Sequence, residues 1–277
     1  MIEWLGIGGS AMAASLADNM PRYLSVQGHR GASGLAPENT LAAFRKAIEL
    51  GANGMEMDLQ MTRDGAVIVI HDDTLDRTTD GHGRVADLTL SEVKQADAGV
   101  KFGSAFRGER VPTLLEVIDL VKASGNDHVR LNLEIKFARG LEGKPEDIEE
   151  RVLAILRETD FIHRVTVQSF HHPSPAKMKR LDPRIVTGLL VGGRQAPSDP
   201  AEQVRQYAAD YYAPEYRAVT AELVRTLHLA GIPVVTWTVN QPEEMRHLLD
   251  LGIGSFLGDG MISNYPDRVL AVLRARR

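Results

Sequence analysis

The chain has 277 residues, of which 43% are hydrophobic and 25% are charged, and its formal net charge is -5. This composition is typical of a folded globular protein, and the length suits one large domain. The acidic balance argues against a nucleic-acid-binding surface, because such a surface needs a basic footprint. The sequence has no cysteine, which excludes a disulfide framework and a thiolate zinc site.

Residues 1–22 come before the first predicted strand and are apolar and rich in small residues. The stretch 15–17 resembles a signal-peptidase site, but the basic segment that precedes an export signal is missing and Glu3 stands there instead. We therefore expect a short amphipathic lead-in helix and a cytoplasmic protein. The alternative is a remnant of an export signal on a periplasmic or secreted protein. No run reaches the roughly 18 apolar residues of a membrane span.

Short β-branched runs alternate with helical patterns along most of the chain. Between the first two runs, residues 40–50 have the apolar spacing of a helix, with Asn39 or Thr40 as N-cap and Gly51 at the C-terminal end. Such alternation predicts a parallel sheet covered by helices. Strands are predicted over residues 24–28, 54–60, 66–71, 129–136, 164–170, 184–191, 210–214, 232–239 and 258–263.

Nine strands are one more than a (β/α)8 barrel needs. The second and third are separated only by the turn sequence TRDG, which is too short for a parallel crossover and predicts an antiparallel hairpin. Eight parallel strands remain. We therefore predict an α/β protein with a (β/α)8 TIM barrel as its single domain over residues 1–277, and an active site at the carboxyl ends of the strands.

Residues 73–112 interrupt the alternation. They are rich in polar and turn residues and contain one short helical pattern, from Leu90 to Ala96. The segment is too long for an ordinary connection and is predicted to form a small inserted lobe over the barrel mouth.

Carboxylates occur inside two predicted strands. Glu56 and Asp58 are two residues apart and therefore share one face, and Glu134 and Lys136 repeat this spacing on the next parallel strand. Ordinary ion pairs are one interpretation. However, neighbouring carboxylates in buried strands are costly unless a cation neutralises them. Oxygen ligands without cysteine favour one hard divalent cation, Mg²⁺ or Ca²⁺, bound by Glu56, Asp58 and Glu134.

Two histidines are predicted to meet these carboxylates. His29 follows the first strand and is therefore expected at the carboxyl rim of the barrel. If the hairpin turn centres just before or just after Asp64, antiparallel pairing places His71 opposite Glu56 or Asp58, respectively. Either histidine alone would more often be structural, but two histidines at one acidic cluster favour catalysis.

This set of groups suits phosphoryl transfer. Arg30 and Lys136 would neutralise phosphate oxygens. One imidazole would take a proton from the attacking hydroxyl, and the other would give one to the leaving alcohol. The glycines in this region would let the backbone approach an anion closely; they are Gly28, Gly31 and Gly34.

At this point the sequence resembles a known family. Residues 28–93 read GHRGASGLAPENTLAAFRKAIELGANGMEMDLQMTRDGAVIVIHDDTLDRTTDGHGRVADLTLSEV, followed in order by LNLEIK, VQSF, VVTWTVN and NYPD. This ordered set resembles the bacterial glycerophosphodiester phosphodiesterase family over residues 26–267. The resemblance implies a metal-dependent TIM-barrel enzyme of glycerophospholipid degradation, which hydrolyses glycerophosphodiesters to sn-glycerol 3-phosphate and an alcohol.

The resemblance also implies residue roles. It makes His29 and His71 the acid and base, and it implies an inserted lobe at 73–112. The metal ligands would be Glu56, Asp58 and Glu134, and the phosphate-binding residues Arg30 and Lys136. One departure concerns the last motif, which in the family is usually similar to Thr-Asp-Tyr-Pro; here Asn264 replaces the carboxylate.

The remaining pocket predictions concern substrate contacts. Gln168 and Phe170 are expected to line the pocket. Trp237 would contact glycerol or a quaternary ammonium group, or would fill the barrel core. Glu38 would contact substrate or lie in the first turn of the following helix. Rival functions are a lysophospholipase D-type activity, against which the polar lobe argues, and a non-catalytic barrel that binds a phosphate ligand.

Overall fold

The computed structural model describes residues 24–136, 147–193 and 198–276. The predicted lead-in helix of residues 1–22 lies outside these ranges. Among the described residues, none of the helices combines the length and the apolar character that crossing a membrane requires.

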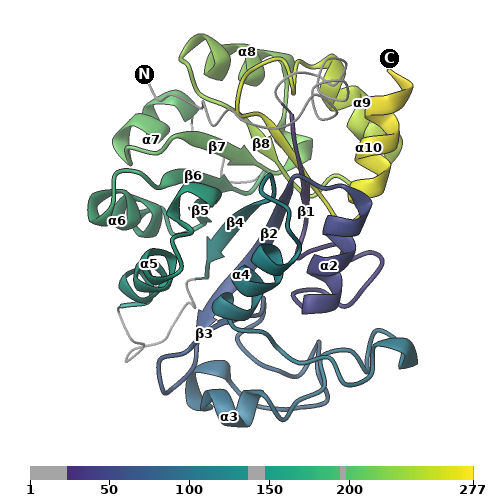
Figure 1. The fold of residues 1–277 in the computed structure, drawn as a ribbon. Coiled ribbons are helices and arrows are strands. Elements are labelled where there is room, and N and C mark those ends of the chain that lie inside the picture. The colour runs from purple at the N-terminus through teal and green to yellow at the C-terminus, as the bar shows by residue number, and fades with distance from the viewer. Residues whose placement is uncertain (1–23, 137–146, 194–197, 277) are drawn as a thin grey trace.

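The fold is a barrel of parallel strands with helices between them (Figure 1). The strands are β1 (Ser25–Gly28), β2 (Gly54–Met61), β3 (Val67–Val69), β4 (Arg130–Ile135), β5 (Val165–Ser169), β6 (Val186–Val191), β7 (Tyr211–Pro214), β8 (Val235–Thr236) and β9 (Gly260–Ser263). Eight of them follow the order β7-β6-β5-β4-β2-β1-β9-β8, and isolated bridges from Tyr212 to Val234 and from Glu215 to Trp237 join β7 to β8. This nearly closed ring confirms the predicted TIM barrel.

Helices cover the outside of this barrel (Figure 1). They are α2 (Leu41–Leu50), α4 (Leu114–Ala123), α5 (Ile148–Glu158), α6 (Pro173–Leu181), α7 (Pro200–Gln206), α8 (Ala221–Leu229), α9 (Pro242–Asp250) and α10 (Pro266–Ala275). A short 3-10 turn, Ile162–Arg164, precedes β5, and another, Tyr216–Ala218, follows β7.

Every predicted strand is present, and only the eighth differs from its predicted range by more than two residues. It was predicted over 232–239, and β8 is limited to Val235–Thr236. Pro233 cannot donate a ladder hydrogen bond. On either side of β8, Val234 and Trp237 pair with the β7 edge only through isolated bridges.

The helix predicted over residues 40–50 is α2. Thr40 is its N-cap and accepts a hydrogen bond from the Ala43 N–H, and Gly51 ends the helix with φ of 89°. The open choice between two caps is therefore resolved in favour of Thr40. The side chain of Asn39 does not cap the helix and instead donates a hydrogen bond to Asp58. Glu38 lies before the cap, so its predicted place in the first turn of the helix is wrong.

The inside of the barrel is polar below the carboxyl ends of the strands. In β4, Leu131 and Leu133 belong to the apolar cluster between the sheet and the helices. Asn132 lies between them, donating to Gln27 Oε1 at 2.9 Å and accepting from Thr166 Oγ1 at 3.0 Å. Satisfied polar groups of this kind form a fixed layer on which the site is built.

The β2–β3 hairpin is antiparallel as predicted, but its predicted register is wrong by one residue. Leu59 pairs with Val69, and this register, if continued, would place His71 opposite Met57. The reason is that the turn has three residues, from Arg63 to Gly65. The Thr62 N–H donates to Ala66 O across this turn at 3.0 Å, and Gly65 has φ of 84°. Because β3 ends at Val69, the pleat no longer determines the face on which His71 lies.

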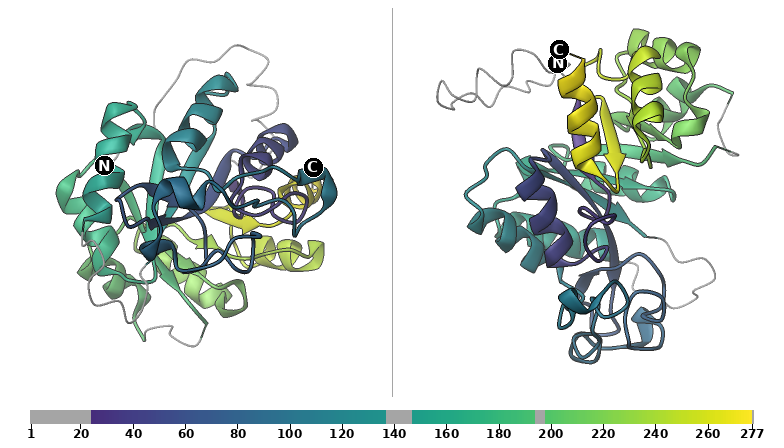
Figure 2. Two further views of the ribbon diagram at one scale, coloured as in Figure 1. Left: turned by 90° about the horizontal axis from the view of Figure 1, so that it is seen from below. Right: turned by 90° about the vertical axis from the view of Figure 1, so that its right-hand side faces the viewer.

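Residues 73–112 lie beyond the end of β2, in front of the barrel when it is seen from below (Figure 2). The segment holds α3 (Leu90–Val93) and two 3-10 turns, Val85–Asp87 and Ser104–Phe106. The predicted helical pattern, which extended to Ala96, is shorter in the structure. Apolar residues of the segment pack with Ile68 and Ile70 around β3 into a small cluster of their own.

A buried carboxylate fixes the connection into β9. Asp259 is 0% exposed. It accepts hydrogen bonds from His228 Nε2 at 3.0 Å and from the backbone N–H groups of Val234, Gly254 and Phe256 at 2.9, 2.8 and 3.3 Å. The end of β9 leads directly to Asn264, so this network also positions a residue of the site.

Replacing Asp259 with alanine is expected to lower the free energy of unfolding by about 3 to 5 kcal/mol, because several buried donors lose their acceptor together. Urea unfolding followed by circular dichroism measures this change. As a control, Asp250→Ala removes an exposed ion pair with Arg276 and should change stability by less than about 1 kcal/mol. Equal losses in the two variants would contradict this account.

Candidate active site

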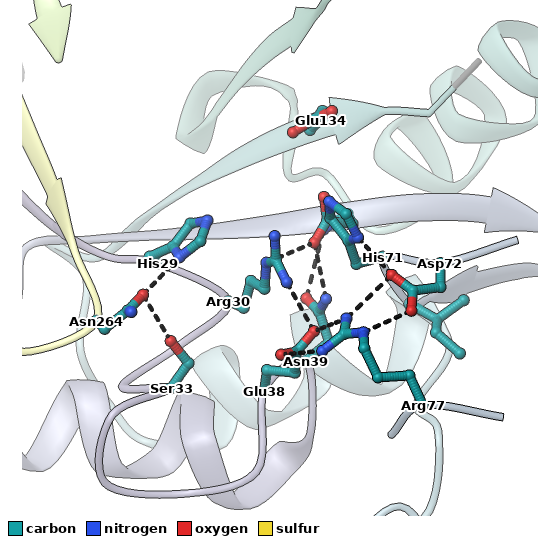
Figure 3. Close-up of polar contacts among 12 residues, drawn as sticks. His29, Arg30, Ser33, Glu38, Asn39, His71, Asp72, Arg77, Glu134 and Asn264 are labelled. Atoms are coloured by element: carbon teal, nitrogen blue, oxygen red, sulfur yellow. Dashed lines mark hydrogen bonds and ion pairs between the residues drawn. The ribbon is translucent and has the colours of Figure 1, made fainter. Parts of the chain in front are cut away.

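The predicted site residues meet at the carboxyl ends of neighbouring strands (Figure 3). His29 and Arg30 directly follow β1, and Glu56 and Asp58 lie in β2. Glu134 lies in β4, which pairs with β2. One pocket of about 410 Å³, its open mouth included, is lined by His29, Arg30, Glu56, His71, Glu134, Lys136, Gln168, Phe170, Leu190, Trp237, Thr238 and Ile262.

Three buried carboxylates form the centre of the site. Glu56, Asp58 and Glu134 are 2%, 1% and 8% exposed, and each offers an oxygen within 4.8 Å of the others. Burial and the charges of its two neighbours raise the pKa of Glu56 well above its usual value. Burial and the charge of Asp58 raise the pKa of Glu134 to about 7. Such mutual repulsion among oxygen ligands fits a hard divalent cation.

Two basic side chains neutralise part of this charge. Arg30 Nε lies 3.3 Å from Asp58 Oδ2, and Lys136 Nζ lies 2.8 Å from Glu134 Oε1 and 3.4 Å from Asp58 Oδ1. Burial acts against ionisation of Asp58, but these two cations outweigh it and hold the pKa of Asp58 below its usual value. Arg30 has φ of 52°, which turns its backbone N–H toward Glu56 Oε2 at 2.9 Å.

His29 is held by a neutral partner. Its Nδ1 lies 2.6 Å from Asn264 Oδ1, which also accepts from Ser33 Oγ at 2.9 Å. Because this amide oxygen is an acceptor, His29 carries its proton on Nδ1 and leaves Nε2 free. Nε2 lies 3.9 Å from Glu56 Oε2. Burial of the ring and the nearby charge of Arg30 lower the pKa of His29 to about 4.

His71 has a charged partner instead. It lies in the loop that follows β3, and its Nδ1 is 2.7 Å from Asp72 Oδ1. Figure 3 shows the ring of His71 on the other side of Arg30 from His29. The two histidines therefore lie in one pocket, as predicted, although the register that led to this prediction is wrong.

The glycines at the end of β1 and in the loop after it make room for other parts of the protein. An added Cβ would lie under 3.0 Å from Gly31 O at residue 28, from the Ala43 backbone at residue 31, and from the Tyr265 ring at residue 34. Protein atoms therefore occupy the space that these glycines leave, and the close approach of the backbone to an anion stays a prediction. The glycines allow the loop to pack against α2 and against the residue that follows Asn264.

The predicted pocket residues form one wall. Gln168 is paired in register with Glu134. Phe170 is 45% exposed and meets Trp237 edge to face, with ring centroids 5.4 Å apart. Trp237 Nε1 donates to Ala213 O at 2.8 Å, and this hydrogen bond from the ring edge fixes the orientation of the indole in the pocket wall.

Known proteins of similar sequence show the family of this chain. The model of the Glycerophosphoryl diester phosphodiesterase family matches residues 29–268. The chain belongs to this family. It is 40% identical over 247 residues to the glycerophosphodiester phosphodiesterase of Caldanaerobacter subterraneus subsp. tengcongensis, covering 89% of this chain and 96% of that protein. It is 36% identical over 263 residues to a glycerophosphodiester phosphodiesterase of Bacillus subtilis, covering 89% and 85%.

Solved structures of phosphodiesterases share the fold. An Oleispira antarctica phosphodiesterase in complex with the product sn-glycerol-3-phosphate matches with a TM-score of 0.80 and 31% identity, over 90% of this chain and 96% of that one. The glycerophosphodiester phosphodiesterase of Thermotoga maritima matches with a TM-score of 0.68 and 28% identity, over 90% and 97%.

Four further residues of this phosphodiesterase-family site were not assigned from the sequence. Asn39 donates to Asp58 Oδ2 at 2.8 Å, and Asn264 holds His29. Asp72 holds His71, and Arg77 contacts Asp72 in turn. Two of these contacts are local, because Asp72 directly follows His71 and Arg77 is five positions from Asp72. The contacts of Asn39 and Asn264 join distant segments of the chain.

Proposed function

We propose that this chain hydrolyses glycerophosphodiesters to sn-glycerol 3-phosphate and an alcohol. The observation that carries the proposal is the single pocket in which two histidines with different partners lie beside a buried acidic cluster. Family membership and the product bound in the Oleispira antarctica relative support it. We further propose that the inserted lobe and the barrel act as one phosphodiesterase domain; the cytoplasmic location stays a prediction.

Glu56, Asp58 and Glu134 are the proposed ligands of one divalent cation, Mg²⁺ or Ca²⁺. When bound, such a cation supplies a Lewis acid that polarises a phosphoryl oxygen. Asn39 would orient Asp58, because it donates to the oxygen that faces Arg30.

Arg30 and Lys136 are the proposed phosphate-binding residues. Both line the pocket, and both already neutralise Asp58. A bound phosphodiester would bring its negative charge to this pair, and hydrogen bonds from the guanidinium and the ammonium would stabilise the charge that grows on its oxygens in the transition state.

We assign His29 as the base and His71 as the acid. A neutral imidazole with a free Nε2 can take a proton from the attacking hydroxyl, and the amide of Asn264 holds His29 in that tautomer. His71 has the carboxylate of Asp72, which can stabilise an imidazolium that gives its proton to the leaving alcohol. The base serves equally whether water or the glycerol 2-hydroxyl attacks phosphorus.

The substrate class is tested by assaying the purified protein, with Mg²⁺ or Ca²⁺, on glycerophosphocholine, glycerophosphoethanolamine, a lysophospholipid and bis-p-nitrophenyl phosphate. We expect turnover of the two glycerophosphodiesters to exceed that of the lysophospholipid. Preferred cleavage of the lysophospholipid would instead identify a lysophospholipase D-type activity. Binding without turnover of any substrate would identify a phosphate-binding barrel.

Replacing Asn264 with aspartate tests the proposed base. The new carboxylate would lie beside His29 Nδ1 and raise the pKa of His29, because a negative neighbour favours the charged imidazolium. The base must be unprotonated, so the acidic limb of the pH profile of kcat/KM should move to higher pH. An acidic limb that stays in place or moves to lower pH would contradict the assignment.

A further inference from the structure

Arg77 belongs to the inserted segment 73–112 and not to the barrel. Its loop is closed by backbone hydrogen bonds from Leu75 N to Gly83 O at 3.0 Å and from Val85 N to Asp73 O at 2.9 Å. Leu75 and Val85 are both buried in the small apolar cluster of this lobe. The core of the lobe therefore fixes the position from which the side chain of Arg77 reaches the barrel.

The guanidinium of Arg77 binds two carboxylates with paired hydrogen bonds. Nε and Nη2 donate to Asp72 Oδ2 and Oδ1 at 2.5 and 3.0 Å. Nη1 and Nη2 donate to Glu38 Oε2 and Oε1 at 2.9 and 2.7 Å. Planar, two-point geometry of this kind fixes both partners and is specific to arginine.

Each of these carboxylates in turn holds one residue of the proposed chemistry. Glu38 Oε1 accepts from Arg30 Nη1 at 2.7 Å, and Asp72 Oδ1 lies 2.7 Å from His71 Nδ1. Figure 3 shows the resulting continuous path from Arg30 to His71, in which Arg77 is the middle residue. Arg77 is absent from the lining of the pocket, so any effect on catalysis must pass through the two carboxylates.

The negative charges of Glu38 and Asp72 explain why the residue between them is a cation. Glu38 and Asp72 would repel each other across the space that the guanidinium fills. Arg77 is the largest cause that lowers the pKa of Asp72 to about 2, and it helps hold the pKa of Glu38 below its usual value against the effect of burial. Among the described residues, the side-chain partners left to the two carboxylates without Arg77 would be Arg30 and His71.

We propose that Arg77 is a positioning residue that orients His71 and Arg30 together toward one phosphodiester, so that the inserted lobe completes the active site. This inference rests on the proposed roles of His71 and Arg30. It assigns the lobe a part in catalysis that is distinct from covering the pocket.

The test compares Arg77→Gln with Arg84→Gln as the matched control. Arg84 lies on the same lobe, and among the described residues its side chain has no hydrogen bond or ion pair. For Arg77→Gln we expect kcat to fall by roughly 10- to 100-fold and the Kd of sn-glycerol 3-phosphate, measured by calorimetry with Mg²⁺ present, to rise several-fold. Arg77→Lys should recover part of both losses because it restores the charge without the paired geometry. Arg84→Gln should match the wild type.

A second variant isolates one branch and does not depend on how well Arg77→Gln folds. Glu38→Gln weakens the contacts of this side chain to Arg30 and Arg77 but leaves the contact between Asp72 and His71 in place. It should therefore raise the Kd of sn-glycerol 3-phosphate more than it lowers kcat. The double variant that combines Glu38→Gln with Arg77→Gln should have a Kd no higher than that of the weaker-binding single variant, since the two residues act through one path.

Wild-type kcat and Kd in Arg77→Gln would overturn the inference, as would equal losses in Arg84→Gln or a further rise of Kd in the double variant. Parallel assay of His71→Ala separates this failure from that of the proposed function. An inactive His71→Ala beside a fully active Arg77→Gln removes only the role of Arg77. A fully active His71→Ala removes the proposed site itself.

Discussion

Replacing either His29 or His71 with alanine is expected to lower kcat by roughly 10²- to 10⁴-fold, the usual contribution of one acid or base. Each imidazole has its own partner, at 2.6 Å for Asn264 and 2.7 Å for Asp72, and neither can substitute for the other across Arg30. Because both histidines are only partly buried, the free energy of unfolding should change little. Steady-state kinetics on glycerophosphocholine measures the effect.

A histidine outside the site provides the control for this pair. His247 is exposed on α9, so His247→Ala should keep wild-type kcat. Circular dichroism melts would verify that all three variants are folded. Full turnover in either His29→Ala or His71→Ala would contradict the acid–base pair, whereas equal losses in all three variants would indicate a general effect on the protein.

Stripping the protein with EDTA is expected to abolish turnover, and Mg²⁺ or Ca²⁺ should restore it. The pKa of Glu134 is raised to about 7 without a cation, so a proton must leave before this carboxylate can bind one. The apparent affinity for the cation should therefore increase as the pH rises through about 7. Titration of activity against Mg²⁺ at several pH values measures this dependence.

Variants of the acidic cluster test the same prediction without a chelator. Asp58→Asn should weaken cation binding by at least tenfold, because it removes one of three charged ligands, and should reduce the rise in Tm that the cation produces. Glu222→Gln, which removes an exposed carboxylate in the first turn of α8, should do neither. Undiminished activity after complete removal of divalent cations would contradict the proposed metal site.

The barrel was predictable because its signal is local. Alternating apolar runs and capped helices such as α2 reveal their periodicity within about 11 to 18 residues. Glu56, Asp58 and Glu134 were identifiable for the same reason, since charges inside otherwise apolar strands stand out against their neighbours. Both signals needed only the sequence of each segment.

What the sequence could not provide depends on turn geometry and on contacts between distant segments. The turn before Ala66 has three residues and is centred on Asp64 itself, and not just before or after it. The register that was expected to position His71 is therefore shifted by one residue. In the sequence Asn264 stands out only as the replacement of a carboxylate, because its contact with His29 spans 235 positions of the chain. The link from Arg77 to Glu38 spans 39 positions and leaves no periodic signal.

The most direct test of the proposed function is to identify which phosphorus–oxygen bond breaks. Purified protein with Mg²⁺ would be incubated with glycerophosphocholine and the products followed by phosphorus NMR. We expect sn-glycerol 3-phosphate and free choline, formed by the wild type and at least about 100-fold more slowly by His29→Ala. Phosphocholine with glycerol, or an unchanged substrate, would contradict it.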